Sequence, residues 1–270
     1  MIGAITYELT AEEAGSVEGF AGRLLHGAFF HHLSECSPAY SKAVHDEIQS
    51  KPFAVSPLIQ PDIPHKMVVE NHIVPVRPGM RFYWRVSALR ADIWEATLAL
   101  KLGSRLQVGR IPFTVTAVYA DGTHESGGLE PEELIAGALE APAPKEISMH
   151  FRSPVTFRRD RLDYPIPTPE MVFASLADKW SQAGMPANIE RDTIREVALA
   201  VSISDWRGRS QRVYFAQHHG ASGCFGDFAY NLQALDEDNR RILLMLAQFA
   251  TFSGVGRLTA QGFGQTRISL

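Results

Sequence analysis

Histidine and lysine side chains in the first quarter of the chain are of types that could support proton transfer. His45 precedes Lys51 by six residues, and His31 and His32 lie upstream of both. A histidine with an ordinary pKa of about 6.5 can accept or release a proton near neutral pH, whereas a lysine stays cationic. Together these residues could supply an acid, a base and a cation to an anionic substrate.

The surroundings of these histidines leave a second interpretation open. His45 lies in VHDEIQSK, a charged stretch that also fits an exposed helix face without a catalytic role. His31 and His32 would point about 100° apart on a helix, so at most one should face a shared site. The pair gives only a weak zinc signal, and we expect neither a metal nor another cofactor.

A glycine-rich segment near the end of the chain, FSGVGRLTAQGFGQTRI, is the most specific local pattern. Gly254, Gly256, Gly262 and Gly264 lie in it between an amphipathic helix and a final strand. Glycine lets backbone N–H groups approach an anion closely and Arg257 adds charge, so the pattern favours a phosphate-binding loop. A tight turn whose glycines serve packing is an equally good alternative. The segment lacks GK[ST] and follows a helix, which argues against a nucleotide-binding P-loop.

Size and charge fit two ordinary domains. A chain of 270 residues with 45% hydrophobic residues can bury two cores. Its net charge of 26 − 30 = −4 does not by itself indicate a nucleic-acid partner. Residues 1–148 hold 12 Lys/Arg and 18 Asp/Glu, whereas residues 149–270 hold 14 and 12, so a polyanion should bind mainly to the second half.

Cysteine usage and hydropathy indicate an intracellular protein. Cys36 and Cys224 are far apart and form no CxxC pair, so no disulfide framework is expected. No stretch approaches the roughly 18 apolar residues of a membrane span, and the N-terminus lacks a signal-peptide pattern. We expect a soluble, cytoplasmic protein without a membrane partner.

Hydrophobic periodicity predicts the elements that must position these residues. In the first half we expect strands at 3–9, 52–59, 81–89 and 109–120 and helices at about 17–29, 37–48 and 91–102. The stretch at 127–145, rich in Glu, Pro, Ala and Gly, is typical of a linker that contains one helical turn. In the second half we expect strands at 146–157, 195–206, 212–219, 224–232 and 264–270 and helices at 170–184 and 236–252.

The order βαββαβ therefore occurs twice, once in residues 1–143 and again in residues 144–270. This order predicts an α+β protein of two tandem ferredoxin-like domains, each with an antiparallel sheet and helices on one face. The first domain carries the histidines and the second carries the glycine-rich segment.

Four segments match one known pattern when they are taken together. They are HDEIQSKPFAVSPL, FRSPVTF with PIPTPEMVFASLADKW, GCFGDFAYNL, and the terminal SGVGRLTAQGFGQ between a helix and a strand. In these segments and in their order, the chain resembles the CRISPR-associated repeat-processing endoribonucleases of the RAMP superfamily. The matches span residues 45 to 267.

The resemblance implies an enzyme that binds CRISPR repeat RNA and cleaves precursor CRISPR RNA without a metal. In that family a 2′-hydroxyl attacks the adjacent phosphate and leaves 2′,3′-cyclic phosphate and 5′-hydroxyl ends. His45 matches the catalytic histidine, and Lys51 matches a lysine that supports the transition state. Phe30 lies about where some relatives have a catalytic tyrosine, so His31 or His32 would share the proton transfers instead.

The resemblance also implies that the glycine-rich segment and nearby basic residues bind RNA. Arg158 and Arg159 lie in the cluster RRDR, although Asp160 and Asp163 offset part of its charge. Further partners would be other CRISPR effector proteins and a second copy of the chain. Two alternatives stay open, a non-catalytic guide-RNA-binding subunit of the same superfamily and a small-molecule-binding protein of tandem ferredoxin-like domains.

Overall fold

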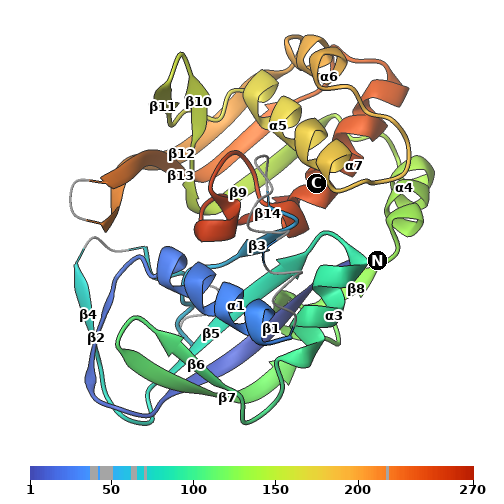
Figure 1. The fold of residues 1–270 in the computed structure, drawn as a ribbon. Helices are drawn as coiled ribbons and strands as arrows, with labels where there is room; N and C mark the ends of the chain where they lie inside the picture. The colour runs from blue at the N-terminus through green and yellow to red at the C-terminus, as the bar shows by residue number, and fades with distance from the viewer. Residues whose placement is uncertain (37–41, 43–50, 62–65, 70–71, 217–218) are drawn as a thin grey trace.

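The computed structural model describes residues 1–36, 42, 51–61, 66–69, 72–216 and 219–270. Its chain forms two main antiparallel sheets, one from each half of the sequence, and each sheet carries helices on one face (Figure 1). The predicted α+β architecture of two tandem ferredoxin-like units is confirmed. The predicted helix at 37–48, which carries His45, lies outside the described residues apart from Lys42.

The first half forms a sheet in the order β3-β5-β1-β7-β6. Strand β7 pairs with the later residues of β1, and β8 pairs with its first residues. Its strands are β1 (Ile2–Ala11), β2 (Gly15–Glu18), β3 (Phe53–Val55), β4 (Ile73–Val76), β5 (Arg81–Ala88), β6 (Arg105–Val108), β7 (Ile111–Tyr119) and β8 (Gly127–Leu129). Its helices are α1 (Gly22–Cys36), α3 (Ala91–Ala99), the 3-10 turn η1 (Thr123–Glu125) and α4 (Pro131–Glu140). Strands β2 and β4 form a separate pair.

Alternation along β1 explains why the helices cover only one face of this sheet. Ile5, Tyr7 and Leu9 are fully buried in the core beneath the helices. Thr6 and Glu8 point to the opposite face, because successive side chains of a strand alternate. On that opposite face Thr6 donates to the His124 carbonyl and Glu8 pairs with Arg81, so its polar groups find partners within the first half.

The second half builds a four-stranded sheet in the order β12-β13-β9-β14. Its strands are β9 (Glu146–Val155), β10 (Phe157–Arg159), β11 (Leu162–Tyr164), β12 (Ser202–Ala216), β13 (His219–Asn231) and β14 (Thr266–Ser269). Its helices are α5 (Pro169–Gln182), α6 (Arg191–Ala198), α7 (Glu237–Ser253) and the 3-10 turn η2 (Thr259–Gln261). Strands β10 and β11 form a small hairpin.

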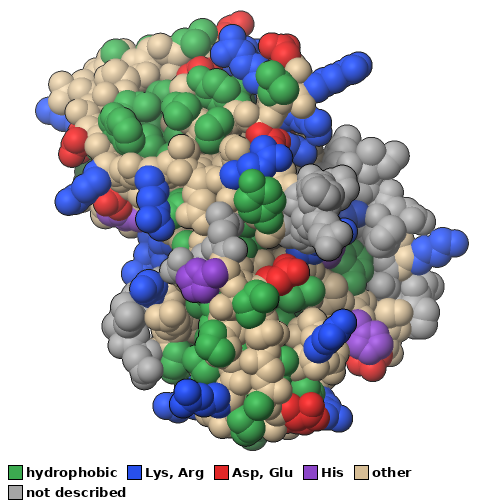
Figure 2. Space-filling view, turned by 90° about the vertical axis from the view of Figure 1, so that its left-hand side faces the viewer, with side chains coloured by type: hydrophobic (Ala, Val, Ile, Leu, Met, Phe, Trp, Pro, Cys, Tyr) green, Lys and Arg blue, Asp and Glu red, His purple; other side chains and the backbone are tan. Residues whose placement is uncertain are grey.

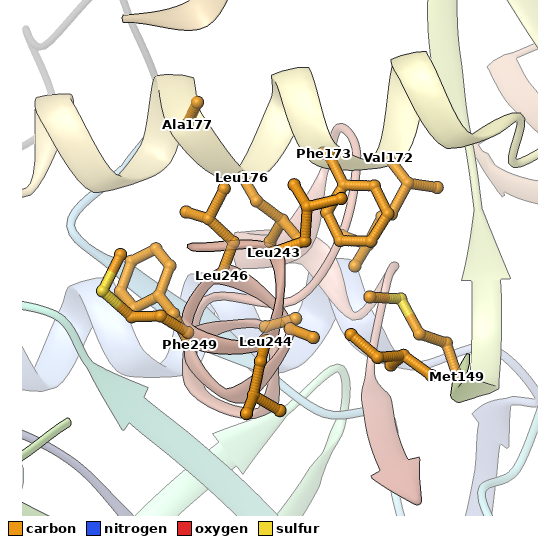
Figure 3. Packing of buried hydrophobic residues seen from close by; sticks show 14 of the residues in the cluster. Met149, Val172, Phe173, Leu176, Ala177, Leu243, Leu244, Leu246 and Phe249 are labelled. Atoms are coloured by element: carbon orange, nitrogen blue, oxygen red, sulfur yellow. The ribbon is translucent and has the colours of Figure 1, made fainter. Parts of the chain in front are cut away.

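The core of the second half lies between α5, α7 and the sheet. Figure 3 shows Phe173 and Leu176 of α5 directed towards Leu243 and Leu246 of α7, with Met149 of β9 beside them. All five side chains are completely buried. This packing holds α7 in place, and the glycine-rich segment follows directly after the C-terminal end of this helix.

Several predictions about local structure differ from the observed fold. The stretch at 127–145 is not a simple linker, because it contains β8 and the ten-residue helix α4, which begins with a capping box between Glu130 and Glu133. The strand predicted at 195–206 begins as α6, and β12 starts only at Ser202. The boundary near Ala143 stays a prediction, and this residue lies between α4 and β9.

The start of α1 also differs from the prediction. Val17 belongs to β2, and α1 begins at Gly22. None of the helices in the described part of the chain is long and apolar enough to cross a membrane.

Candidate functional site

The glycine-rich tail, defined here as residues 254–265, folds into a compact loop that only glycine permits at several positions. Gly256 has φ of 73°, and a Cβ there would lie 2.5 Å from the Thr156 carbonyl oxygen. Gly264 has φ of 69°, and its Cβ would lie 2.2 Å from the Val255 carbonyl oxygen. Both positions combine a left-handed backbone with close approach of another backbone, so a side chain would displace the loop.

The backbone N–H groups of these glycines already have partners inside the protein. Gly254 donates to the Ala250 carbonyl at 2.9 Å, Gly256 to the Ser175 hydroxyl at 3.2 Å, and Gly264 to the Pro154 carbonyl at 2.9 Å. Gly262 donates to the Thr259 carbonyl at 3.4 Å. The packing interpretation therefore accounts for the glycines, and direct phosphate binding by their N–H groups stays a prediction.

The tail docks onto the first half of the molecule, where it contacts α1 and β3 (Figure 1, red against blue). A Cβ on Gly22, the first residue of α1, would lie 2.1 Å from the Gln261 carbonyl oxygen. The Ala260 carbonyl lies 2.7 Å from His26 Nδ1. The Gln265 amide donates to the Val55 carbonyl of β3 at 3.1 Å. The tail is thus a joint between the two halves, made of neutral groups in close contact.

This joint holds the elements that carry the predicted catalytic residues. Lys51 is half-buried and lies two residues before β3, the strand whose Val55 carbonyl the tail binds. His45 lies outside the described residues, so its position relative to Lys51 stays a prediction. Lys51 is therefore four residues away in sequence from the β3 residue that the tail binds.

His31 and His32 are also on α1, but they face away from the tail. His31 is 73% exposed, and its Nε2 lies 3.4 Å from a carboxylate oxygen of Glu35. His32 is buried, and its Nε2 lies 2.9 Å from the Ala96 carbonyl of α3. The structure therefore does not bring these two histidines to the tail or to β3, and their catalytic role stays a prediction.

The histidine that does meet the tail is His26. Its ring stacks on Phe53 of β3 with centroids 5.7 Å apart, and it contacts Phe30 at 4.7 Å. Because the Ala260 carbonyl can only accept a hydrogen bond, His26 Nδ1 carries the hydrogen. The sequence offers one signal for this residue, since His26 and Phe30 are four residues apart and share a helix face.

The predicted RNA-binding arginines lie near the base of the tail and on the β10–β11 hairpin. Arg257 forms an ion pair with Asp163 at 3.3 Å. Arg158 is exposed and donates to the Arg161 carbonyl at 3.2 Å, and the Arg159 guanidinium lies 5.9 Å from the Tyr164 ring centroid. On the face shown in Figure 2, Lys and Arg side chains occur on both halves and along the waist between them. RNA binding by these residues stays a prediction.

A second contact between the halves is ionic. The Glu125 carboxylate accepts a hydrogen bond from Arg152 at 2.6 Å and forms an ion pair with Arg267. One acidic side chain of the first half therefore binds two arginine side chains of the second half. Arg85 is buried beside them and donates to the Glu125 carbonyl at 2.8 Å. Burial, with the charges of Arg152 and Arg267, lowers the pKa of Arg85 to about 9.

Metal ligands do not gather in the part of the chain that the structure describes. Within these residues, no group of three or more His, Cys, Asp or Glu side chains is placed to hold an ion.

Comparison with known families identifies the chain. Residues 5–124 match the model of the CRISPR Cas6 N-terminal domain, and residues 149–266 match the model of the CRISPR-associated endoribonuclease Cas6. The chain belongs to the Cas6 family. It is a CRISPR-associated endoribonuclease, so the predicted family, the predicted class of enzyme and an RNA partner are confirmed. No curated protein matches the chain.

Solved Cas6 structures share the whole fold. One Cas6 product complex has 26% sequence identity and a TM-score of 0.79, and the match covers 100% of both chains. A Cas6 from Thermus thermophilus has 26% identity and a TM-score of 0.73, with 100% of this chain and 98% of that chain covered. A Cas6 substrate mimic complex has 25% identity, a TM-score of 0.71 and 99% coverage of both chains.

Proposed function

We propose that this Cas6 endoribonuclease cleaves precursor CRISPR RNA within its repeat by attack of an RNA 2′-hydroxyl on the adjacent phosphate. The products would carry a 2′,3′-cyclic phosphate and a 5′-hydroxyl. This reaction needs a base, an acid and a cation, and the nucleophile belongs to the substrate, so no metal is required. The observation that carries the proposal is the docking of the tail onto α1 and β3, next to Lys51.

We assign His45 to proton transfer and Lys51 to stabilisation of the negative charge that develops on the phosphate. We assign the second proton-transfer role to His26 of α1. Its Nδ1 is hydrogen-bonded to the Ala260 carbonyl, and its ring packs against Phe53, two residues after Lys51. It is a better candidate for the second proton-transfer group than His31 or His32, which face other elements.

RNA binding is proposed for the basic side chains around the base of the tail. Arg257, Arg158 and Arg159 lie on or beside the β10–β11 hairpin, and the first of them pairs with Asp163 at 3.3 Å. Phosphate groups of RNA could compete for an exposed guanidinium of this kind through charge-assisted hydrogen bonds. The tail glycines then contribute by holding Arg257 in place rather than by their own N–H groups.

The decisive experiment incubates purified protein with an end-labelled cognate repeat RNA in EDTA. We expect cleavage at one position, with a cyclic phosphate on the upstream product. A matched substrate with deoxyribose at the nucleotide 5′ to the scissile phosphate should bind normally and remain intact. Activity that EDTA abolishes and Mg²⁺ restores, or normal cleavage of the deoxyribose substrate, would contradict the proposed mechanism.

Substitution of the histidines assigns their roles. His45→Ala should reduce the single-turnover rate by about 10²–10⁴-fold, as expected for loss of a general acid or base, and should change RNA affinity by less than about threefold. His26→Ala is compared with His31→Ala and His32→Ala in the same assay. If the His31 or His32 variant is the slower one, the preference for His26 is wrong.

A further inference from the structure

A buried lysine underlies the tail and has no part in the chemistry above. Lys179 of α5 is only 5% exposed, and its ammonium donates to the Thr259 hydroxyl at 2.7 Å and to the Ser253 carbonyl at 3.2 Å. Both acceptors are neutral oxygens. Burial lowers the pKa of Lys179 to about 7, which shows that its surroundings disfavour the charge. A buried cation is costly, so its position calls for a physical reason.

The position of Lys179 relative to α7 supplies part of that reason. Ser253 is the last residue of α7, so its carbonyl is one of the terminal acceptors that have no partner within the helix. The negative end of the helix dipole also favours a cation at this point. Lys179 therefore caps α7 where the tail begins.

The second acceptor lies on the other side of the tail's first turn. Thr259 opens η2, and the next two residues, Ala260 and Gln261, make the contacts with His26 and Gly22 of α1. One ammonium thus binds both ends of the segment from Ser253 to Thr259. A shift of Thr259 would move the two residues that press on α1.

We propose that Lys179 is a positioning residue for RNA cleavage, because it fixes η2 against α1 by joining Ser253 to Thr259. The contact chain runs from Lys179 through Thr259 and Ala260 to His26, and so from the core of the second half to the catalytic region of the first. The inference rests on the proposed function in one respect, since it takes α1 and β3 as the carriers of catalytic groups.

Variants of Thr259 test the hydrogen bond at nearly constant volume. Thr259→Val keeps the shape but removes the acceptor, whereas Thr259→Ser keeps the hydroxyl. The single-turnover rate is measured with RNA fully bound, alongside the dissociation constant. We expect Thr259→Val to lose about tenfold to a hundredfold in rate, in the range that a small misplacement of catalytic groups costs, with affinity within about threefold. Thr259→Ser should recover most of that rate.

Lys179→Met removes the charge at similar length, and a destabilised control separates positioning from general loss of stability. Ile194→Ala, on α6, creates a cavity in the same core without touching the tail. All variants are assayed well below their melting temperatures. Lys179→Met should slow cleavage as Thr259→Val does, whereas Ile194→Ala should melt earlier and cleave bound RNA at the normal rate.

Several outcomes would overturn the inference. They are equal rates for Thr259→Val and Thr259→Ser, an effect confined to RNA affinity, or an equal loss of rate in Ile194→Ala. If Lys179→Met does not fold, the Thr259 pair still decides. Failure of the proposed function would appear differently, as normal cleavage by His45→Ala or of the deoxyribose substrate, whatever the Thr259 variants do.

Discussion

Among the contacts between the two halves of the molecule, two differ clearly in physical character. The tail joins α1 and β3 through neutral groups, with the Gln261 carbonyl pressed against Gly22 and the Ala260 carbonyl bound to His26. The other contact joins Glu125 to Arg152 and Arg267. Close neutral packing tolerates almost no displacement, whereas Coulomb attraction falls slowly with distance and is weakened by salt.

The two contacts therefore have different roles in holding the halves together. A contact made of backbone atoms sets positions to a fraction of an ångström, which catalytic geometry requires. An ionic contact holds the halves together without specifying their positions as closely, and its strength depends on the solution. The tail contact includes His26 and is near Lys51 in sequence. The contact that fixes atomic positions more closely is therefore the one near the proposed catalytic groups.

The strongest way to break this comparison is to add one methyl group at the tail contact. Gly22→Ala would place a Cβ 2.1 Å from the Gln261 carbonyl oxygen, so η2 must move away from α1. We expect the bound-RNA cleavage rate to fall by about 100-fold, with a stability loss of about 1–3 kcal/mol. Single-turnover kinetics and urea unfolding measure the two effects.

Gly27→Ala on the same helix is the matched control for that substitution. A Cβ at Gly27 meets no described atom within 4 Å, and alanine favours a helix over glycine by about 0.5–1 kcal/mol. This variant should be at least as stable as the parent and fully active. Equal losses from both substitutions would mean that the contact with Gln261 is unimportant.

The pH dependence of the free energy of unfolding tests whether Lys179 is buried beneath the tail. Its pKa of about 7 in the folded protein lies below its ordinary value of about 10.5, so the unfolded chain binds more protons between these pH values. Lys179 therefore makes stability rise with pH from about 7 to 10, by up to about 1.4 kcal/mol per pH unit. Urea unfolding of the wild type relative to Lys179→Met should show this rise, and parallel curves would contradict the assigned burial.

Removal of the acidic partner tests the ionic contact. Glu125→Gln keeps the shape but leaves Arg152 and Arg267 without their shared carboxylate, and we expect a loss of about 1–3 kcal/mol at low salt. The difference from wild type should shrink as salt rises, since screening weakens the pair in the wild type. The effect of Gly22→Ala should not change with salt. A salt-independent Glu125→Gln difference would remove the distinction between the two contacts.

The smallest effect is expected from Arg257, the charged side chain of the tail. Arg257→Ala should weaken RNA binding several-fold and reduce the slope of log affinity against log salt by about one, as loss of one phosphate contact does. The rate for bound RNA should change less than the affinity. An unchanged dissociation constant at moderate salt would show that Arg257 serves only its ion pair with Asp163.

Local patterns in the sequence were sufficient for most of the fold. Apolar and polar residues alternate from Ile5 in β1 and from Phe82 in β5, and apolar residues recur at helical spacing in α5 and α7, so periodicity predicts these elements. The helix α4 was predicted as no more than one turn because its Glu, Pro, Ala and Gly residues resemble a linker, although Pro131 follows an N-cap and suits the first turn. In α6, the apolar residues of REVALA fit either a helix or a strand.

The candidate site was harder to predict because its contacts are not local. The glycines of the tail are visible in the sequence, but nothing near Gly22 or His26 shows that each meets a backbone carbonyl from the other end of the chain. The resemblance to the family placed the second proton-transfer group at His31 or His32, and His26 was not predicted for that role. The partner of a close backbone contact leaves no pattern of its own, since any residue type offers a carbonyl.

The hydrogen bond between His26 and Ala260 joins residues 234 positions apart, and this separation has a consequence for the order of folding. During translation, α1 leaves the ribosome long before η2 exists, and domains generally fold in the order of synthesis. The first sheet must therefore complete its own packing with the α1 surface at Gly22 still bare. Contacts of such high sequence separation form late, because the intervening chain must first be ordered. The nascent chain would acquire its nuclease activity only after η2 has been synthesised and has docked onto α1.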